Sequence, residues 1–477
     1  MSSQTRYPRP LHEQRPTPAS AATKIRIAIL ATAIVDALGG PGEFKPRFRY
    51  PFIDSMIPNE HFDVPPGTWT DDTSMMLCLA HSIATSTSPD GFHDPHQMDM
   101  YLKWYKEGYL SPTGDCFDIG NSTRYALDIY SKRQMQAQTP PKDRRFKSLF
   151  KSFTKATSSP QDYYTFSWST LALAEIRKTL EGDVFSGNGS LMRLLPIPLV
   201  YYYNTSKTRE YARRSSETTH PSRMCIELCE VWAHVIAMVM RATTGSSPYY
   251  DITGKQEEKK ITKLDILHYI ATHQWRHRKL EQAFKLPNSH PTPPHPPDDS
   301  PITNPEELES FYQEHHPIFK VLAEVRQGNP SERKIMTDLQ PEGPPEEHAR
   351  VFNLIPETTK IPSQGFVANT FAAALYCFLA TETFEDGALL AVNLGHDTDT
   401  TGAVYAGLAG TWYGCEDDPD EEKTKDVGRD KSTDEREGEV GMLGSFWSER
   451  VRTWGDELVK REMVEEVAEE LVQQQQM

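Results

Sequence analysis

The chain has 477 residues, and its 67 Asp and Glu against 51 Lys and Arg give a formal net charge of −16. Because so acidic a chain without a long basic patch repels a phosphate backbone, we expect no nucleic-acid partner. No stretch reaches the roughly eighteen apolar residues that a membrane helix requires, so no membrane partner is expected either. Six scattered cysteines predict reduced thiols inside a cell, with a cytoplasmic location, the nucleus as a second compartment and mitochondria less favoured.

Composition predicts one folded domain with polar tails and insertions. Residues 1–23 lack the apolar core of a secretory signal and predict a disordered tail, while 473–477 form a polar tail. The domain between them, 24–472, shows almost no alternating apolar pattern, which predicts a mostly α fold. Runs rich in proline or charge predict disordered insertions, at about 131–165, 242–363 and 416–440. Some helix is expected within the second insertion, at 263–284 and 305–326.

The first predicted helix, 24–40, is apolar on every side and therefore buried, and it carries a single acid, Asp36. A buried acid is more often a hydrogen-bonded structural group than a metal ligand, so we expect Asp36 to support a site rather than bind a ligand. The pair Gly39 and Gly40 ends the helix. Glu43, on the loop after that pair, is free to point into a pocket.

Two acidic motifs lie far apart in the sequence, at 67–73 and 393–402, and each leads into an apolar helix. One aspartate or threonine is enough to cap a helix N-terminus, so a second carboxylate exceeds what stability requires. If both motifs are buried side by side, their four carboxylates repel one another unless cations neutralise them. The alternative is that both are ordinary capping sequences with surplus aspartates facing water.

The ligand atoms that these motifs offer are all oxygen, which indicates a hard cation such as magnesium or manganese. Asp71 and Asp72 are adjacent, so their side chains diverge at a helix start and could serve different ions. We therefore predict two Mg²⁺ ions, with Mn²⁺ as the alternative.

Two glycine-containing loops offer further candidate binding residues. The loop 114–123 is rich in Gly and Asp before a helix, and it could equally be an ordinary turn and cap. At 187–190, two glycines let a ligand approach the backbone, and a helix start presents N–H groups to phosphate, although the same residues also make a tight turn. His220 precedes another apolar helix, where it could be a capping residue without a catalytic role.

Together these stretches resemble the ADP-ribosylglycohydrolase family, whose members include dinitrogenase reductase-activating glycohydrolase and the ADP-ribosyl-arginine and ADP-ribosyl-serine hydrolases. The resemblance covers roughly half of the chain in the family's order. Besides the Thr-His-Pro at His220, it rests on the segments VDALGGPGEF, PPGTWTDDTSMMLCLA, GDCFDIGNSTRYAL, SGNGSLMRLLPIPL, FVANTFAAALYCFL and AVNLGHDTDTTGAVYAGLAGTWYG.

The resemblance implies an all-α, compact single-domain orthogonal helical bundle with two Mg²⁺ ions in a central cleft. It implies a monomeric hydrolase that cleaves the glycosidic bond between ADP-ribose and a modified protein side chain, acting on an ADP-ribosylated protein or an ADP-ribose derivative. The residues it places on the metals are Thr70, Asp71, Asp72, Asp397, Asp399 and Thr400.

Other site residues follow from the same resemblance. Three carboxylates are candidates for the group that aligns or deprotonates the attacking water, in the order Glu43, Asp72 and Asp118. The loop from Asp115 to Gly120 would line the distal ribose. The residues expected to meet the ADP-ribose backbone and diphosphate are Gly187, Asn188, Gly189 and Ser190. His220 matches a family position near the ligand.

His396 departs from the family, many of whose members have Gly or Asp there. A titratable ring beside the metals could bind substrate or alter the pH profile.

The sequence leaves two alternative functions open. The first is a catalytically inactive protein that binds ADP-ribose without cleaving it. The second is a metal-dependent nucleotide phosphohydrolase, which would explain the paired aspartates but not the 187–190 loop.

Overall fold

The computed structural model describes residues 9–138, 160–244, 261–286, 302–327, 346–415 and 446–476. Throughout these ranges the regular structure is helical, apart from two isolated bridges, Asn59 with Val64 and Gly187 with Phe366. The predicted all-α fold class is confirmed. Among the helices described, none combines the length and apolar character that a membrane crossing requires. The predicted insertion at 416–440 lies outside the described residues, as does 139–159 of the insertion at 131–165.

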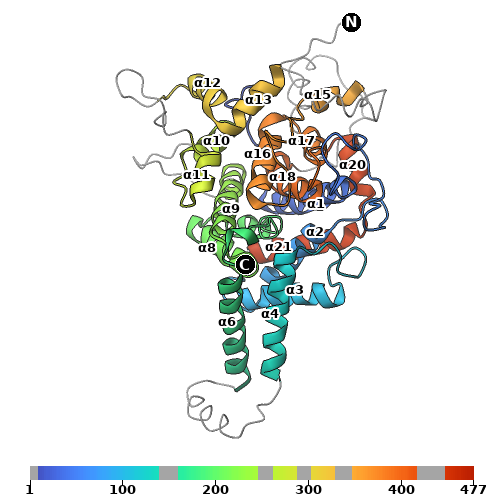
Figure 1. Cartoon of the computed structure of the whole chain (residues 1–477), viewed down its shortest axis with the longest axis vertical. Helices are drawn as coiled ribbons and strands as arrows, with labels where there is room; N and C mark the ends of the chain where they lie inside the picture. Colours follow the sequence, from blue (N-terminus) through green and yellow to red (C-terminus); the bar gives the residue numbers. More distant parts are fainter. Residues whose placement is uncertain are drawn as a thin grey trace, which may run out of the picture.

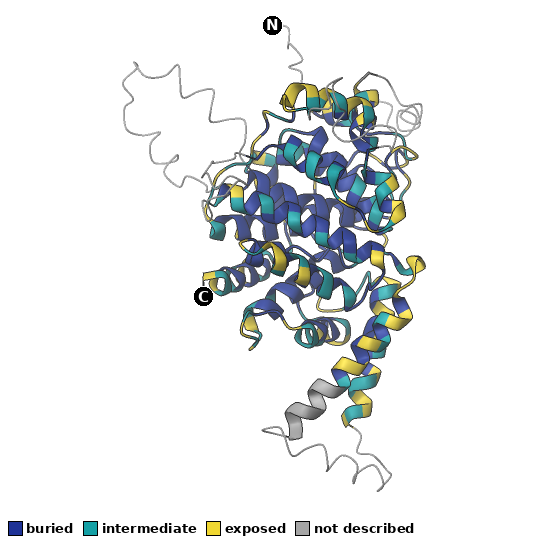
Figure 2. Cartoon of the chain, turned by 90° about the vertical axis from the view of Figure 1, so that its left-hand side faces the viewer, coloured by how far each residue is buried: buried dark blue, intermediate teal, exposed yellow. Residues whose placement is uncertain are grey.

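A layer of buried helices forms the centre of the molecule, and it is mostly dark blue in Figure 2. Helices α1 and α18 run along each other in this layer, and α16 and α17 pack against α18 (Figure 1). Almost every residue of α1 and all of α18 are buried, because both helices are apolar on every side. The bounds of these helices are Ala21–Gly39 for α1, Val367–Ala380 for α16, Phe384–Val392 for α17 and Thr398–Tyr413 for α18.

Small residues allow α1 and α18 to approach each other closely. A Cβ placed on Gly410 would lie 2.8 Å from Ala31 Cβ, and one on Gly402 would lie 2.8 Å from Val35 Cγ1. A Cβ on Gly39 would lie 2.7 Å from the backbone of Asp399. Because the C-terminal end of α1 therefore meets the first turn of α18, the second acidic motif is brought to the glycine pair that follows Asp36.

Helix α2 begins at the first acidic motif and packs between α3 and the C-terminal helix α21, which also crosses α1. The loop ahead of α2 is tied to the chain before α21: Trp69 Nε1 donates to Val459 O at 2.9 Å, and the Val459 N–H donates to Gly67 O. The bounds of these helices are Asp71–Thr85 for α2, Asp94–Glu107 for α3 and Arg461–Gln476 for α21, which is preceded in the chain by α20, Glu449–Asp456.

Helices α4 and α6 pair with each other and project away from the rest of the molecule, as both views show (Figures 1 and 2). The base of this pair adjoins α3 and α8, and α8 packs on α9. The bounds of these helices are Asn121–Gln138 for α4, Pro160–Leu180 for α6, Pro196–Tyr201 for α7, Thr205–Glu217 for α8 and Arg223–Thr243 for α9.

Parts of the predicted insertion at 242–363 are packed helix, while 245–260, 287–301 and 328–345 lie outside the described residues. Ile266, Leu280 and Tyr312 are fully buried, and Lys263 Nζ donates to Phe378 O at 2.6 Å and to Thr381 O at 2.7 Å. The helices expected at 263–284 and 305–326 are confirmed, and their apolar side chains complete the core beside α16. The bounds of the helices in this region are Lys263–Thr272 for α10, Arg278–Phe284 for α11, Pro305–His315 for α12, Pro317–Gln327 for α13 and Ala349–Phe352 for α15.

Candidate active site

Asp36 holds the first turn of α2. Its carboxylate accepts hydrogen bonds from the Thr70 N–H at 3.1 Å and the Thr73 N–H at 3.0 Å. The hydroxyls of the same two threonines donate to it at 2.9 and 2.6 Å. Thr70, at the N-cap position, does not cap α2 with its own side chain. The expectation that Asp36 supports the site is met, because this acid on α1 caps α2.

The two acidic motifs meet at Asp72. Its Oδ2 lies 3.2 Å from Thr70 Oγ1 and accepts a hydrogen bond of 3.2 Å from Thr400 Oγ1 on α18. Carboxylate oxygens of Asp36, Asp72 and Asp399 lie within 4.8 Å of one another. All of these residues are buried, so the predicted juxtaposition of the motifs is realised.

A second group of carboxylates adjoins the first through Asp399. One oxygen each from Glu43, Asp118 and Asp399 lies within 4.8 Å of the others. Glu43 reaches this position because α1 ends at its glycines, and the short helix Gly40–Gly42 then carries the chain past Thr398. Asp118 enters from the loop before α4 with a left-handed backbone, φ 50°.

Three carboxylate oxygens in these groups are buried without a hydrogen-bond partner: Glu43 Oε2, Asp72 Oδ1 and Asp399 Oδ1. Burial, followed by repulsion from neighbouring acids, raises the pKa of Glu43, Asp72 and Asp399 well above the ordinary range. Such atoms are costly to bury as anions unless a cation meets them. The donor set is oxygen only, so the residues present fit a hard cation.

Asp71 and Asp397 extend the same negative region. Burial raises the pKa of both carboxyls, and for Asp71 the acids Asp118 and Asp36 raise it further. Asp397 Oδ2 accepts a hydrogen bond of 2.7 Å from Asn188 Nδ2, whose other contact is Thr370 Oγ1 at 2.9 Å. Asn188, expected to meet substrate, therefore also orients a predicted metal ligand.

The 187–190 loop lies against the second acidic motif and His220. The Asn188 N–H donates to Gly365 O, and a Cβ on Gly365 would lie 2.9 Å from Asp397 Oδ2. A Cβ on Gly189 would lie 2.8 Å from the ring of His220, so only glycine fits there without a shift of the ring. His220 is buried, and burial followed by the nearby Arg193 charge lowers its pKa to about 3. The ring is therefore neutral at physiological pH.

Three residues that were predicted to bind substrate lie apart from the carboxylate groups or face away from an opening. The Ser190 hydroxyl is 1% exposed and bonds to Ser216 and Cys229, so its side chain supports the loop rather than lining an opening. Asp115 and Gly120 are exposed at the two ends of the loop that delivers Asp118. In the described contacts, the side chain of Asp115 meets none of the site carboxylates. The loop's contribution to the carboxylate groups is Asp118.

His396 lies in a turn and has a left-handed backbone conformation. Its φ is 66°, its N–H donates to Lys45 O at 2.7 Å, and its carbonyl accepts from the Phe44 N–H at 2.6 Å. Burial and the nearby Arg47 charge lower the pKa of the ring. His396 thus ties the Glu43 loop to the second acidic motif.

Sequence reasoning missed Arg47, which is 3% exposed behind that turn. Its guanidinium donates to Leu394 O, to Pro356 O at 2.9 Å and to Ile361 O at 2.7 Å. These carbonyls come from segments that are distant in sequence, and no local pattern around Arg47 identifies it.

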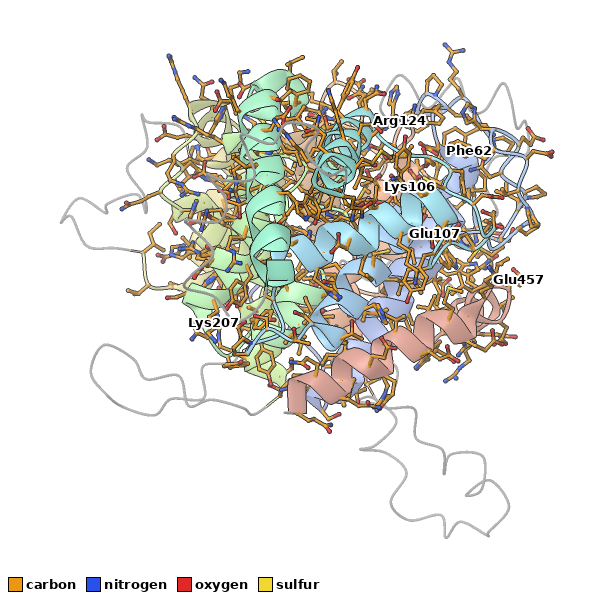
Figure 3. The ribbon with its side chains drawn as sticks, turned by 90° about the horizontal axis from the view of Figure 1, so that it is seen from below. Phe62, Lys106, Glu107, Arg124, Lys207 and Glu457 are labelled. Atoms are coloured by element: carbon orange, nitrogen blue, oxygen red, sulfur yellow. The ribbon has the colours of Figure 1, made fainter. Side chains whose placement is uncertain are left out.

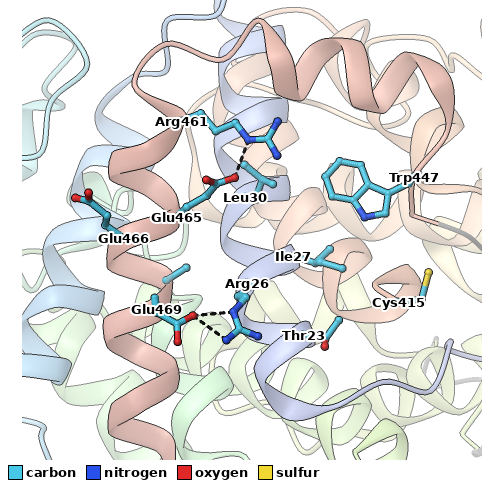
Figure 4. A pocket seen from close by; sticks show the side chains of 11 residues that line it. Thr23, Arg26, Ile27, Leu30, Cys415, Trp447, Arg461, Glu465, Glu466 and Glu469 are labelled. Carbon is cyan, nitrogen blue, oxygen red and sulfur yellow. Dashed lines mark hydrogen bonds and ion pairs between the residues drawn. The ribbon is translucent and has the colours of Figure 1, made fainter. Parts of the chain in front are cut away.

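Two other places in the described residues are weaker candidates for a functional site. A cavity of about 570 Å³ lies between α1, α21 and Trp447, but its arginines are paired, Arg26 with Glu469 and Arg461 with Glu465 (Figure 4). It borders the N-terminal half of α1, away from Asp36. Asp54, Glu347 and His348 also cluster, but Arg450 pairs with Glu347 at 2.9 Å, so that cluster already has a cation.

The raised carboxyl pKa values predict a pH-dependent stability of the metal-free protein. Burial raises the pKa of Asp118 to about 7, so the stability this group contributes is present below its unfolded pKa of about 4 and is lost as pH rises through about 7. We expect Asp118→Asn to stabilise the protein in chelator by about 1–3 kcal/mol at about pH 8 and by less at about pH 5.5. Urea unfolding at both pH values measures this. An equal effect at both would contradict the argument.

The fold and the site define a class: an all-α protein with buried, oxygen-rich carboxylate groups at converging helix ends, able to hold hard cations. The sequence profile of the ADP-ribosylglycohydrolase family matches residues 17–431. The chain therefore belongs to this family, as its motifs predicted, and is a glycohydrolase by class.

Individual relatives agree with this assignment. The chain is 24% identical over 396 residues to "ADP-ribosylarginine hydrolase Tri1" of Serratia proteamaculans, covering 83% of this chain and 73% of the relative. It is also 24% identical over 405 residues to the protein of the same name from Pseudomonas putida, covering 85% of this chain and 74% of the relative. A solved structure titled "ADP-ribosylglycohydrolase-related protein complex" aligns with TM-score 0.50 and 25% identity, covering 96% of this chain and 99% of that one.

Proposed function

We propose that this protein hydrolyses the bond between ADP-ribose and an arginine side chain of a modified protein, with two Mg²⁺ ions bound. The observation that carries the proposal is the set of unpartnered buried oxygens on Glu43, Asp72 and Asp399, next to the 187–190 loop. The names of the Serratia and Pseudomonas relatives support arginine as the linked residue.

The site residues divide into two roles. Those that would hold the ions when bound are on the two acidic motifs: Thr70, Asp71, Asp72, Asp397, Asp399 and Thr400. The bound ions would supply positive charge that orients the ribose hydroxyls and the attacking water. Glu43 and Asp118 stand beside Asp399 and are placed to take a proton.

In the proposed reaction, water oxygen bonds to ribose C1 while the bond from C1 to the guanidine nitrogen breaks. Bound cations would favour the ionised forms of Glu43 and Asp118, so that one of them accepts the water proton. A proton returns to the leaving nitrogen, and free ADP-ribose and an unmodified arginine result. In this proposal, backbone groups of Gly187 and Gly189 would meet the diphosphate, because glycine permits close approach. His220, neutral behind that loop, fixes the position of the loop rather than transferring protons.

The test is release of ADP-ribose from two defined peptides, one modified on arginine and one on serine. We expect release from the arginine peptide with Mg²⁺, loss of release in excess chelator, and recovery when Mg²⁺ is restored. Release only from the serine peptide would contradict the linkage, and full activity in chelator would contradict the metal requirement. Binding of ADP-ribose without release would favour an inactive binder, and release of phosphate alone would favour a nucleotide phosphohydrolase.

A further inference from the structure

Four aromatic side chains form a connected group that the proposed reaction does not use. Phe44 and His61 have ring centroids 4.7 Å apart, His61 and Phe62 also 4.7 Å, and Phe62 and Phe117 5.4 Å. We refer to Phe44, His61, Phe62 and Phe117 as the aromatic cluster. Its members come from two segments, the chain between α1 and α2 and the loop before α4.

Two members of the aromatic cluster are chain neighbours of the carboxylates proposed to act on water. Phe44 directly follows Glu43, and Phe117 directly precedes Asp118, while oxygens of Glu43, Asp118 and Asp399 lie within 4.8 Å of one another. The cluster and two of these carboxylates, Glu43 and Asp118, are thus presented by the same two loops.

Packing does not explain the aromatic cluster. Phe44 is 57% exposed and His61 is also exposed, so the two rings bury little apolar surface. Phe44 in addition holds a left-handed backbone, φ 59°, which is costly for a residue other than glycine. An exposed phenylalanine kept in a strained conformation next to a charged site is better explained by contact with a ligand.

The surroundings determine which ligand chemistry fits. The faces of aromatic rings carry negative charge density and attract cations, and the neighbouring carboxylates add to that field. A guanidinium is planar, remains charged, and stacks on aromatic faces while its N–H groups reach carboxylates. A serine linkage offers neither charge nor a planar surface.

We infer that the aromatic cluster binds the guanidinium of the modified arginine, and so selects the linked side chain on the leaving-group side of the scissile bond. This inference rests on the proposed function. Phe44 and His61 are exposed, and Figure 3 shows Phe62 in the same upper right part of the view as Arg124 of α4. The exposed rings of the cluster are therefore reachable by a side chain that projects from the surface of a folded protein.

The experiment compares kinetic constants of four variants. Phe62→Ala removes the ring, and Phe62→Leu keeps apolar volume without an aromatic face. Phe44→Ala tests the second ring, and Tyr203→Ala is the control, because Tyr203 is an equally exposed aromatic residue, also 57% exposed, between α7 and α8. KM and kcat are measured with the arginine-modified peptide, and the inhibition constant is measured for free ADP-ribose, which lacks a guanidinium.

We expect both Phe62 variants and Phe44→Ala to raise KM about 5- to 10-fold, the range of an exposed or partly desolvated cation–π contact. For the Phe62 variants kcat is expected to stay within about twofold. The ADP-ribose inhibition constant and the Tyr203→Ala constants are expected to remain unchanged.

Several outcomes would overturn the inference. An inhibition constant that rises together with KM would place the cluster against ADP-ribose itself. A Phe62→Leu variant with ordinary KM would mean apolar contact rather than recognition of a cation. Unchanged KM in Phe44→Ala and Phe62→Ala would remove the cluster from substrate binding, while the proposed function would stand. If the unaltered protein releases nothing from the arginine peptide, the proposed function fails first and this inference fails with it.

Discussion

Asp399→Ala is expected to abolish turnover, lowering kcat by about a thousandfold or more, and to weaken Mg²⁺ binding. Asp399 is the one residue common to both carboxylate groups, with Asp36 and Asp72 on one side and Glu43 and Asp118 on the other. Its Oδ1 is buried without a partner, so the side chain is positioned for a ligand from outside the chain. The substitution removes a predicted metal ligand, and it also removes the carboxylate that neighbours the candidate bases Glu43 and Asp118.

The measurement is ADP-ribose release from the arginine peptide, paired with Mg²⁺ titration by calorimetry. Asp456→Ala is the control, because this acid on α20 is 77% exposed in its side chain and pairs with Arg461 instead. We expect the control to retain full activity. Full activity in Asp399→Ala would rule out the two-metal proposal, whereas loss of activity with ordinary Mg²⁺ affinity would assign Asp399 to substrate rather than to metal.

The acidic motifs could be predicted because their signal is local. Two carboxylates at the start of an apolar helix exceed the need for a cap, and the structure places Asp72 of one motif within 3.2 Å of Thr400 of the other. The support from Asp36 was also predictable, since an acid within a helix that is apolar on every side must find hydrogen bonds. The helical fold followed from the absence of alternating apolar patterns.

Other features depend on contacts that sequence alone does not contain. Asn188 bonds to Asp397, 209 residues away, so its part in orienting a predicted ligand was not visible. Ser190 was predicted to be a binding residue beside two glycines, yet its hydroxyl is buried against Ser216, because it lies in a turn ahead of α7 and not at a helix start. The aromatic cluster is likewise assembled from separate loops, and its phenylalanines are indistinguishable in sequence from core residues.

Asp36→Ala is expected to lower the free energy of unfolding by about 3 kcal/mol or more in excess Mg²⁺. The substitution leaves two N–H groups and two hydroxyls of Thr70 and Thr73 without their acceptor in a buried place. Without Mg²⁺ the loss should be smaller, because removing one of several buried anions also relieves repulsion with Asp72 and Asp399. Asp36→Asn keeps an acceptor oxygen for the N–H groups and should lose about half as much.

Asp36→Ala also tests whether Asp36 supports Mg²⁺ binding in addition to stabilising the fold. Because Asp36 orients Thr70 and the first turn that carries Asp72, Asp36→Ala should also weaken Mg²⁺ affinity about 10- to 100-fold. Asp99→Ala is the matched control, because burial raises the pKa of both Asp36 and Asp99 to about 6. Asp99 accepts a hydrogen bond from Tyr130, but it lies on α3 outside the carboxylate groups. We expect Asp99→Ala to lose stability with Mg²⁺ affinity unchanged. Equal losses of affinity in both variants would mean that Asp36 acts only through folding.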